Sequence, residues 1–191
     1  EIKHNRWTRI NIGPYLPDAS LSSSRAEQQN TEFAKLLQQG GVKDAEAYTH
    51  AKLQLVRWHK LAINASMNPS SVLSNGSTNA AMAKDPELSR HLHATMLEIL
   101  TTAPRIIGQD FPPEFASADK LLASTRKNTS GSRPSMWLDW EAGKTMELEV
   151  ILGNPIRIAR EKGFEMPRLQ TLYALLKMAQ SNRDQAAKAK L

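Results

Sequence analysis

The sequence predicts a mainly α-helical protein, in which a multi-helix bundle follows a short strand–helix unit. Apolar residues recur at helical spacing through most of the chain after residue 51, whereas residues 6–13 alternate between polar and apolar as a strand does. The chain has 191 residues, of which 40% are hydrophobic. That is enough for one domain with a substantial core.

The N-terminal part predicts one strand and one helix. The strand lies within residues 6–13, which a Gly-Pro pair ends. Ser24 and Glu27 form a capping box before a helix that the glycines at 40–41 should terminate. A lone strand and helix cannot bury their apolar faces, so this part must pack on something else. Residues 42–51 are compatible with a short strand or an early helix start.

The first helix of the bundle contains Trp58 and carries a polar stripe. Lys60, Asn64 and Asn68 are spaced four residues apart and therefore lie on the same helical face. Pro69 disfavours α geometry in the residue before it and cannot continue the hydrogen-bond ladder. We therefore expect this helix to end near Asn68, with a polar line along an otherwise apolar element.

Local end signals place the helices that follow. Asp85-Pro86 is an N-cap with proline at the first helical position, and this helix should run toward Gly108. A shorter helix is expected to contain Phe115, followed by a polar loop and a helix that Pro134 opens.

Two further helices complete the predicted bundle. Thr145 can cap the first of them, which should end before Gly163, and Pro167 starts the last one. Residues 181–191 are expected to fray. In the first of these helices, we expect Leu148, Ile151 and Ile158 to face the core.

Composition excludes several classes of function. The 25 Lys and Arg residues are scattered among 19 acidic residues and give a net charge of +6. No basic stripe interleaved with aromatic residues occurs, so nucleic-acid binding is not expected. The absence of cysteine excludes disulfides and thiolate metal sites and fits a reducing compartment. No stretch approaches the roughly 20 apolar residues that cross a bilayer, so we expect a cytoplasmic protein without a membrane partner.

Lys60 has two interpretations. A lysine on a helix most often extends its ammonium into solvent. Alternatively, Lys60 is desolvated and donates a proton to a developing alkoxide, as a general acid does. Asn64 and Asn68 favour the second interpretation because amides offer both donors and acceptors to a polar ligand, although they are equally able to make interhelical hydrogen bonds.

Ser135 and Glu147 complete the candidate set. Ser135 lies in the first turn of a predicted helix, where an anion such as a carboxylate is favoured, although a serine there also serves as a plain cap. Glu147 follows the possible cap Thr145, a common place for a carboxylate in any helix. Together Lys60, Ser135 and Glu147 offer an acid, an anion anchor and a hydrogen-bond acceptor, which suits the reduction of a polar 2-oxo acid.

Other motifs do not indicate chemistry. His91 and His93 diverge on a helix and are interpreted as surface residues, so no metal site is predicted. No Gly-x-Gly-x-x-Gly or other phosphate-cradling motif occurs, and the cofactor-binding residues stay unknown. The tryptophans at helical spacing most often serve packing.

With these residues in view, the chain resembles the C-terminal, catalytic half of the ketopantoate reductase (2-dehydropantoate 2-reductase) family. The resemblance covers most of residues 52–191, and residues 6–41 resemble the last strand and helix of the family's nucleotide-binding domain. Order and spacing agree along the chain. The matching residues are Arg57-Trp58-x-Lys60-Leu-x-x-Asn64-x-x-x-Asn68-Pro69, Pro134-Ser135-Met136-x-x-Asp139-x-x-x-Gly143-x-x-x-Glu147, Gly153-Asn154, Ala159-Arg-x-x-Gly163-x-x-x-Pro167 and Leu172-Tyr173.

The resemblance implies a fold like the C-terminal domain of 6-phosphogluconate dehydrogenase for residues 43–191, with residues 1–42 as a remnant of a Rossmann domain. It also implies the NADPH-dependent reduction of 2-dehydropantoate to pantoate in pantothenate and coenzyme A biosynthesis, with NADPH bound mainly by a domain absent from this chain. By the resemblance, each candidate has a role. Lys60 would be the general acid, Asn64 and Asn68 would bind the substrate hydroxyl and help hold the lysine, Ser135 would bind the carboxylate, and Glu147 would contact the hydroxyl and the lysine.

Some points stay open at this stage. The substrate could be another 2-oxo acid, or the chain could be a non-catalytic helical dimerisation module; a homodimer is compatible with either reading. The family often has a further substrate-side Asn after the first helix, and Asn75, Thr78 and Asn79 compete for that place. The family's Asn-Gly pair reads Gly153-Asn154 here. We expect little or no turnover from the chain alone.

Overall fold

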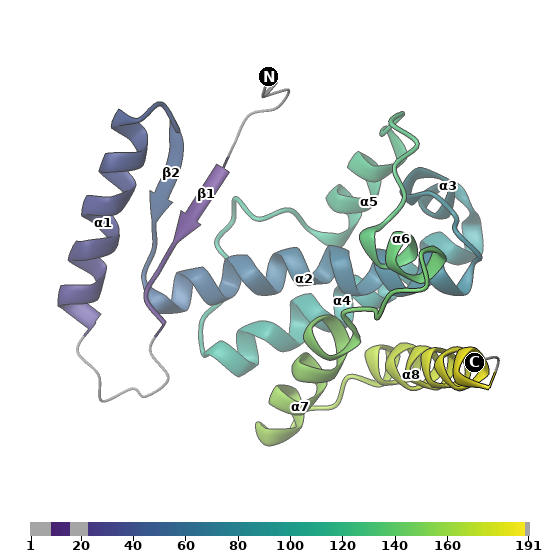
Figure 1. The fold of residues 1–191 in the computed structure, drawn as a ribbon. Coiled ribbons are helices and arrows are strands. Elements are labelled where there is room, and N and C mark those ends of the chain that lie inside the picture. Colours follow the sequence, from purple (N-terminus) through teal and green to yellow (C-terminus); the bar gives the residue numbers. More distant parts are fainter. Residues whose placement is uncertain (1–8, 16–22, 190–191) are drawn as a thin grey trace. The chain divides into compact units, whose positions relative to one another are not determined.

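The computed structural model describes residues 9–15 and 23–189 (Figure 1). The described residues are mostly helical, as predicted, and divide into two compact units between Arg57 and Trp58. The dividing point lies within one helix, α2 (His50–Leu73). The first unit holds the only two strands of the described residues, and the second is built from helices.

The first unit contains a strand–helix–strand motif. Strand β1 (Arg9–Ile12) leads into α1 (Ser23–Gln39), and strand β2 (Asp44–Ala47) then pairs with β1 in parallel. The strand predicted within residues 6–13 is therefore confirmed for Arg9–Ile12, while residues 6–8 lie outside the described part. Both alternatives for residues 42–51 are met in part, because β2 is a short strand and α2 begins at His50.

The start of α1 corrects one prediction. Ser24 lies inside the helix rather than at its N-cap, because the helical backbone already includes Ser23. The predicted end is confirmed, since Gly41 adopts a φ of 95° that favours glycine and the Val42 N–H donates to the Leu37 carbonyl at 2.9 Å.

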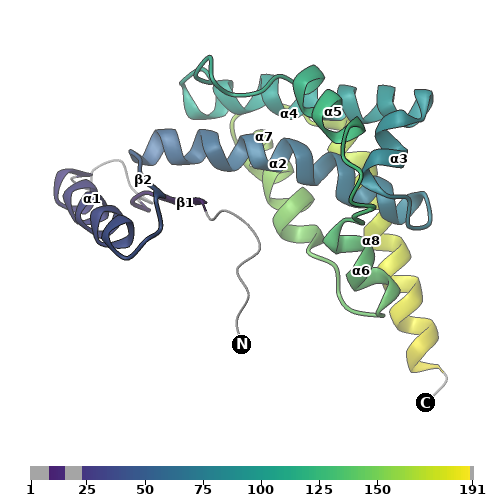
Figure 2. The ribbon, with the colours of Figure 1, turned by 90° about the horizontal axis from the view of Figure 1, so that it is seen from above.

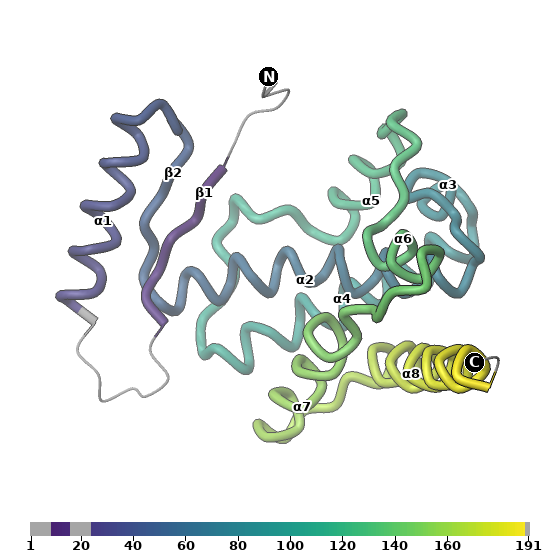
Figure 3. Tube along the Cα trace, in the orientation of Figure 1, coloured from purple at the N-terminus to yellow at the C-terminus, as the bar shows by residue number. Residues whose placement is uncertain are grey.

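Helix α2 continues past the proline that was expected to end it. Pro69 lies inside the helix, which reaches Leu73 and is visible as an unbroken trace in Figure 3. Pro69 is almost fully buried, so packing compensates for the lost N–H. The hydroxyls of Ser66 and Ser70 each donate at 2.7 Å to the carbonyl four residues earlier, so neither bonds to the Ala65 carbonyl that Pro69 leaves without its helical donor.

The caps of the middle helices follow the sequence closely. Asp85 Oδ1 accepts from the Leu88 N–H at 2.8 Å, and α4 (Pro86–Ile107) ends at Gly108 in the left-handed conformation, as predicted. Phe115 lies outside the next helix, because Ser117 caps it and the helical residues begin at Ala118. The remaining helices of this region are α3 (Asn79–Lys84), α5 (Ala118–Arg126) and α6 (Ser135–Glu141).

A π-helical turn, η1 (Glu149–Gly153), precedes α7 (Asn154–Glu161) and shifts the helical face. Leu148 and Ile151 are buried as predicted, but Ile158 is 41% exposed, so its predicted place in the core is wrong. A π-turn inserts one residue, and Ile156 and Ala159 point inward instead. Thr145 does not cap this helix. The first helical hydrogen bond runs from the Ile151 N–H to the Glu147 carbonyl, two residues after Thr145.

The last helix, α8 (Pro167–Lys188), starts as predicted but does not fray from residue 181. Gln180 Oε1 accepts from the Met146 N–H at 2.7 Å. The Arg183 guanidinium stacks 4.5 Å from the Trp140 ring centroid and donates to the Lys144 carbonyl at 2.9 Å. These contacts hold the final turns against the segment between α6 and η1.

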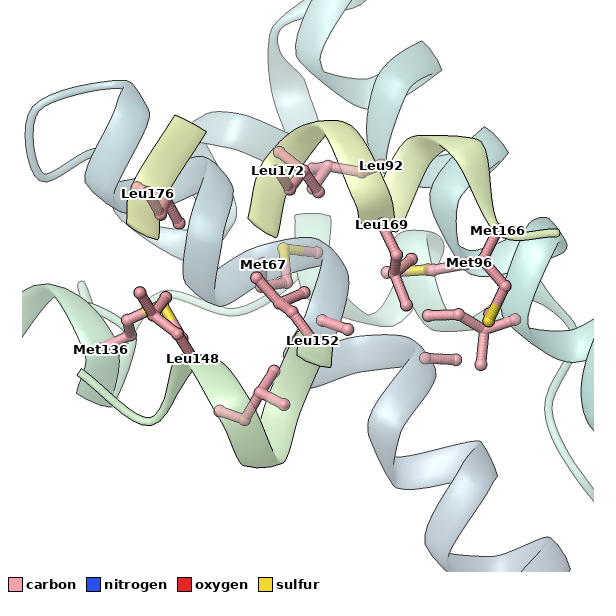
Figure 4. Close-up of a cluster of buried hydrophobic side chains, with 14 of the residues drawn as sticks. Met67, Leu92, Met96, Met136, Leu148, Leu152, Met166, Leu169, Leu172 and Leu176 are labelled. Atoms are coloured by element: carbon pink, nitrogen blue, oxygen red, sulfur yellow. The ribbon is translucent and has the colours of Figure 1, made fainter. Parts of the chain in front are cut away.

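One apolar cluster fills the second unit (Figure 4). Helices α2, α4 and α8, together with η1 and α6, contribute leucine and methionine side chains that meet at its centre. Burial of each such side chain contributes about 1.5–3 kcal/mol. The labelled members are Met67, Leu92, Met96, Met136, Leu148, Leu152, Met166, Leu169, Leu172 and Leu176.

A pair of leucines on α8 tests this core. Leu169 is 0% exposed and Leu175 is 54% exposed. Leu169→Ala should lower the free energy of unfolding by about 2–5 kcal/mol because it leaves a cavity. Leu175→Ala should change it by no more than about 0.5 kcal/mol. Urea unfolding followed by tryptophan fluorescence measures both, and equal losses would contradict the burial of Leu169.

Candidate active site

The polar stripe of α2 changes from exposed to buried along the helix. Lys60 is exposed, Asn64 is half-buried and Asn68 is 7% exposed. The rise of an α-helix places Lys60 and Asn68 about 12 Å apart along the axis. Apolar residues on the other faces of this helix pack in the core, so the prediction of one polar line on an apolar helix is confirmed. The buried apolar residues are Ala62, Ala65 and Met67.

The side chains of this stripe have no hydrogen-bond partners among residues 9–15 and 23–189. The alternative of interhelical hydrogen bonds from Asn64 and Asn68 is therefore not observed there. Neither amide atom of Asn68 is among the fully buried side-chain atoms that lack a partner in the described residues, so the amide reaches the surface and is available to a ligand. Of the two interpretations of Lys60, its exposure within the described residues matches the ammonium that extends into solvent and not the desolvated one.

The rotation of α2 around its axis is fixed by the residue next to the lysine. The His59 ring packs edge-on against Phe111 and Phe115, with centroids 6.0 and 5.0 Å away. Its Nε2 lies 2.8 Å from the Ala116 carbonyl oxygen. Because His59 and the buried Trp58 face the core side, Lys60 is held on the outward face.

Ser135 is the first residue of α6, and its side chain is exposed. The cap position belongs to Pro134, which makes no side-chain cap bond, so the alternative that Ser135 is a plain cap is wrong. The hydroxyl has no partner within the described part of the chain. The two following residues, Met136 and Trp137, are 1% and 8% exposed and anchor the helix in the core.

Glu147 lies just before the η1 turn with its side chain in solvent. Its neighbours Met146 and Leu148 are both 4% exposed, so alternation along this segment turns the carboxylate outward. No hydrogen bond or ion pair within the described residues joins it to the stripe or to Ser135. Among the candidate site residues, Asn68 alone is therefore buried.

The three residues that competed for a further substrate-side amide have different environments. Thr78 caps α3, since its hydroxyl accepts from the Ala81 N–H at 3.2 Å. Asn75 is exposed in the turn after α2, with a φ of 55°. Asn79 opens α3, and its side-chain oxygen is buried without a partner in the described chain.

The histidines of α4 are half-buried, which corrects their interpretation as surface residues. Burial, and then the nearby Arg168, lower the pKa of His91. His93 Nε2 lies 3.1 Å from Asp119 Oδ1 beside a hollow of about 240 Å³ between α4 and α5, without the alignment of a hydrogen bond. In the described segments, no three metal-ligating side chains come together.

Sequence reasoning missed a polar network at the π-turn. The Tyr173 hydroxyl donates to Glu149, and Arg157 Nη2 donates to Glu149 Oε2 at 2.8 Å. Lys177 Nζ donates to the tyrosine oxygen at 3.1 Å. A Cβ added at Gly153 would lie 2.6 Å from Glu149 Oε2, so any other residue there would make this carboxylate shift. In the sequence, Gly153 was the feature that pointed to this network. The partners come together only because of the π-turn, which the sequence did not predict.

The comparison with known proteins identifies the family. Residues 52–180 match the family model described as Ketopantoate reductase PanE/ApbA C terminal. The chain belongs to the ketopantoate reductase family. This is a family of oxidoreductases, and both the predicted family and the predicted mainly α fold are confirmed.

Individual relatives agree with this assignment. An uncharacterised protein of Saccharomyces cerevisiae is 37% identical over 138 residues, covering 68% of this chain and 36% of that protein. A 2-dehydropantoate 2-reductase of Nostoc is 32% identical over 125 residues, covering 65% of this chain and 38% of that protein. The crystal structure of 2-dehydropantoate 2-reductase from Methylococcus capsulatus aligns with a TM-score of 0.75 at 30% identity, covering 94% of this chain and 53% of that one.

The chain thus spans about half or less of the length of these relatives. Within the described ranges, no helix combines the length and apolar character that crossing a bilayer requires.

The network at Glu149 should make stability depend on pH. The hydrogen bond from Tyr173, followed by that from Arg157, lowers the pKa of Glu149 from the ordinary 4.5. A depressed pKa stabilises the fold above the unfolded-state value, and this contribution is lost as the pH falls through the folded-state value. Glu149→Gln should therefore reduce stability at neutral pH, and the difference from wild type should vanish in acid. Urea unfolding across pH measures this.

Glu161→Gln is the matched control, because Glu161 is exposed on α7 and has no ion pair within residues 9–15 and 23–189. High salt should shrink the effect of Glu149→Gln, since exposed charges are screened. If Glu149→Gln lowers the free energy of unfolding by the same amount at acid pH, the loss does not come from the ionised Glu149 carboxylate.

Proposed function

We propose that this chain is the substrate-binding and general-acid part of an NADPH-dependent reductase that converts 2-dehydropantoate to pantoate. The observation that carries the proposal is the α2 stripe, in which Asn68 is 7% exposed and has no partner among the described residues. Family membership and the names of the Nostoc and Methylococcus relatives support the reaction.

The first unit supports an association with a nucleotide-binding domain. Parallel strands joined by a helix are the building unit of such domains, and β1, α1 and β2 form one. The sequence placed the domain boundary after residue 42, but β2 pairs with β1, so we propose that the nucleotide-binding part extends through β2 and that the catalytic part follows it. The described residues contain no glycine-rich phosphate turn, so we assign none of them to holding NADPH.

In the proposed reaction, the bound cofactor supplies a hydride to the carbonyl carbon of the substrate. The Lys60 ammonium donates a proton to the carbonyl oxygen, which becomes the hydroxyl of the product. Asn64 and Asn68 bind the hydroxyl that the substrate already has, and Ser135 Oγ donates to its carboxylate. Glu147 accepts from the substrate hydroxyl and orients the lysine.

Lys60→Ala tests the general acid. In the native protein that contains this sequence, kcat for 2-dehydropantoate should fall about 10²–10⁴-fold, because proton transfer in the transition state is lost. The unfolding midpoint should not change, since Lys60 is exposed and unpartnered in the described structure. Lys84→Ala, an exposed lysine on α3, is the control. NADPH oxidation measures turnover, and a fully active Lys60→Ala protein would rule out the role of Lys60.

Asn68→Ala tests the ligand assigned to the buried amide. Loss of one substrate hydrogen bond of about 1–1.5 kcal/mol should raise KM about five- to tenfold. The effect should be absent for a 2-oxo acid that lacks the hydroxyl, because Asn68 then has no group to bind. Steady-state kinetics with both substrates measures the difference. A rise in KM of the same size for both would show that Asn68 does not bind the hydroxyl and would favour another 2-oxo acid as substrate.

A further inference from the structure

Two short segments approach each other closely near the C-terminal end of α2. The turn after α2 contains Gly76, and α6 contains Trp137, two residues after Ser135. A Cβ added at Gly76 would lie 2.5 Å from Cε2 and 2.6 Å from Cζ2 of Trp137. The indole therefore lies directly against the glycine backbone, and Figure 2 shows α6 beside the C-terminal end of α2.

The glycine side of this contact is rigid. Gly76 has a φ of 89°, which favours glycine, and its N–H donates to the Ser71 carbonyl at 2.8 Å. The hydroxyl of Ser71 donates to the Ser77 carbonyl at 2.7 Å. Because Ser71 is in α2, three residues after Asn68, these bonds fix the turn to the end of the helix that carries the amide stripe.

The tryptophan side is held by shape rather than by a hydrogen bond. Trp137 is 8% exposed, and its Nε1 is buried without an acceptor within the described ranges. A second tie lies close by in sequence, where the Asn79 N–H donates to the Ser132 carbonyl at 3.2 Å. Helix α6 has only seven residues and no side-chain cap, so contacts such as these determine where its first residue lies.

We infer that the contact between Gly76 and Trp137 positions the Ser135 hydroxyl relative to the amide stripe and thereby sets the binding of the substrate carboxylate. This inference rests on the proposed function of Ser135. Trp137 and Gly76 are positioning residues and do not touch the substrate. A displaced indole moves the start of α6, which weakens binding in the ground state and the transition state alike and therefore raises KM more than it lowers kcat.

Gly76→Ala in the native protein tests the inference, because the added methyl group meets the indole ring. We expect KM for the 2-oxo acid to rise about tenfold, with kcat changed less than twofold. Gly108→Ala is the matched control, since Gly108 also has a positive φ of 77° but no atom within 4 Å of its added Cβ. Its KM should stay within twofold of wild type. The double variant Gly76→Ala/Trp137→Leu should raise KM no more than Trp137→Leu alone, because the added methyl group acts only by displacing the indole.

Two further variants keep the outcome decisive. If Gly76→Ala does not fold, Trp137→Leu alone should raise KM, because the indole no longer fixes α6. Ser135→Ala should raise KM as much as Gly76→Ala, and the two changes together should not add. A folded Gly76→Ala protein with wild-type KM, beside a Ser135→Ala protein with raised KM, overturns the positioning role and leaves the proposed function intact. An unchanged KM in Ser135→Ala overturns the role of Ser135 and this inference with it.

Discussion

The close packing of the C-terminal half of α2 is the constraint on which the second unit depends. Small side chains there are almost completely buried, so neighbouring elements approach the helix backbone closely on several sides. Pro69 fits into this packing although it lacks an N–H, and the serines beside it bond back to the helix. The same enclosure buries Asn68 and leaves Lys60 outside, so one helix supplies both the core and the polar stripe.

Local sequence signals predicted those elements whose ends are determined locally. Asp85, Pro86 and Gly108 define α4 because a cap, a fixed φ and a left-handed glycine act within a few residues. Pro69 misled the prediction because the favourable burial of its ring involves residues distant in sequence. Ile158 was misplaced because the π-turn before it moves every later residue by one position, and periodicity alone does not reveal such an insertion.

In the candidate site, too, local features were predictable from the sequence and features that depend on distant residues were not. Spacing placed Lys60, Asn64 and Asn68 on one face, since four residues make about one turn of any α-helix. Their gradient of burial was not predictable, because it depends on which helices cover each turn. Glu149 and its partners come from η1, α7 and α8, so no local pattern in the sequence brings them together.

The burial of residues in the α2 stripe distinguishes two interpretations of the chain, a catalytic domain and a purely structural module. Asn68 is enclosed apart from its amide, whose atoms are not among the fully buried unpartnered ones of the described residues. A dimerisation module would gain from an apolar residue at Asn68, where alanine and methionine already pack on the neighbouring faces. A reductase gains from the amide itself, because a ligand that binds there completes its hydrogen bonds about two helical turns from Lys60. The arrangement of α2 thus favours the proposed catalytic domain over a dimerisation module.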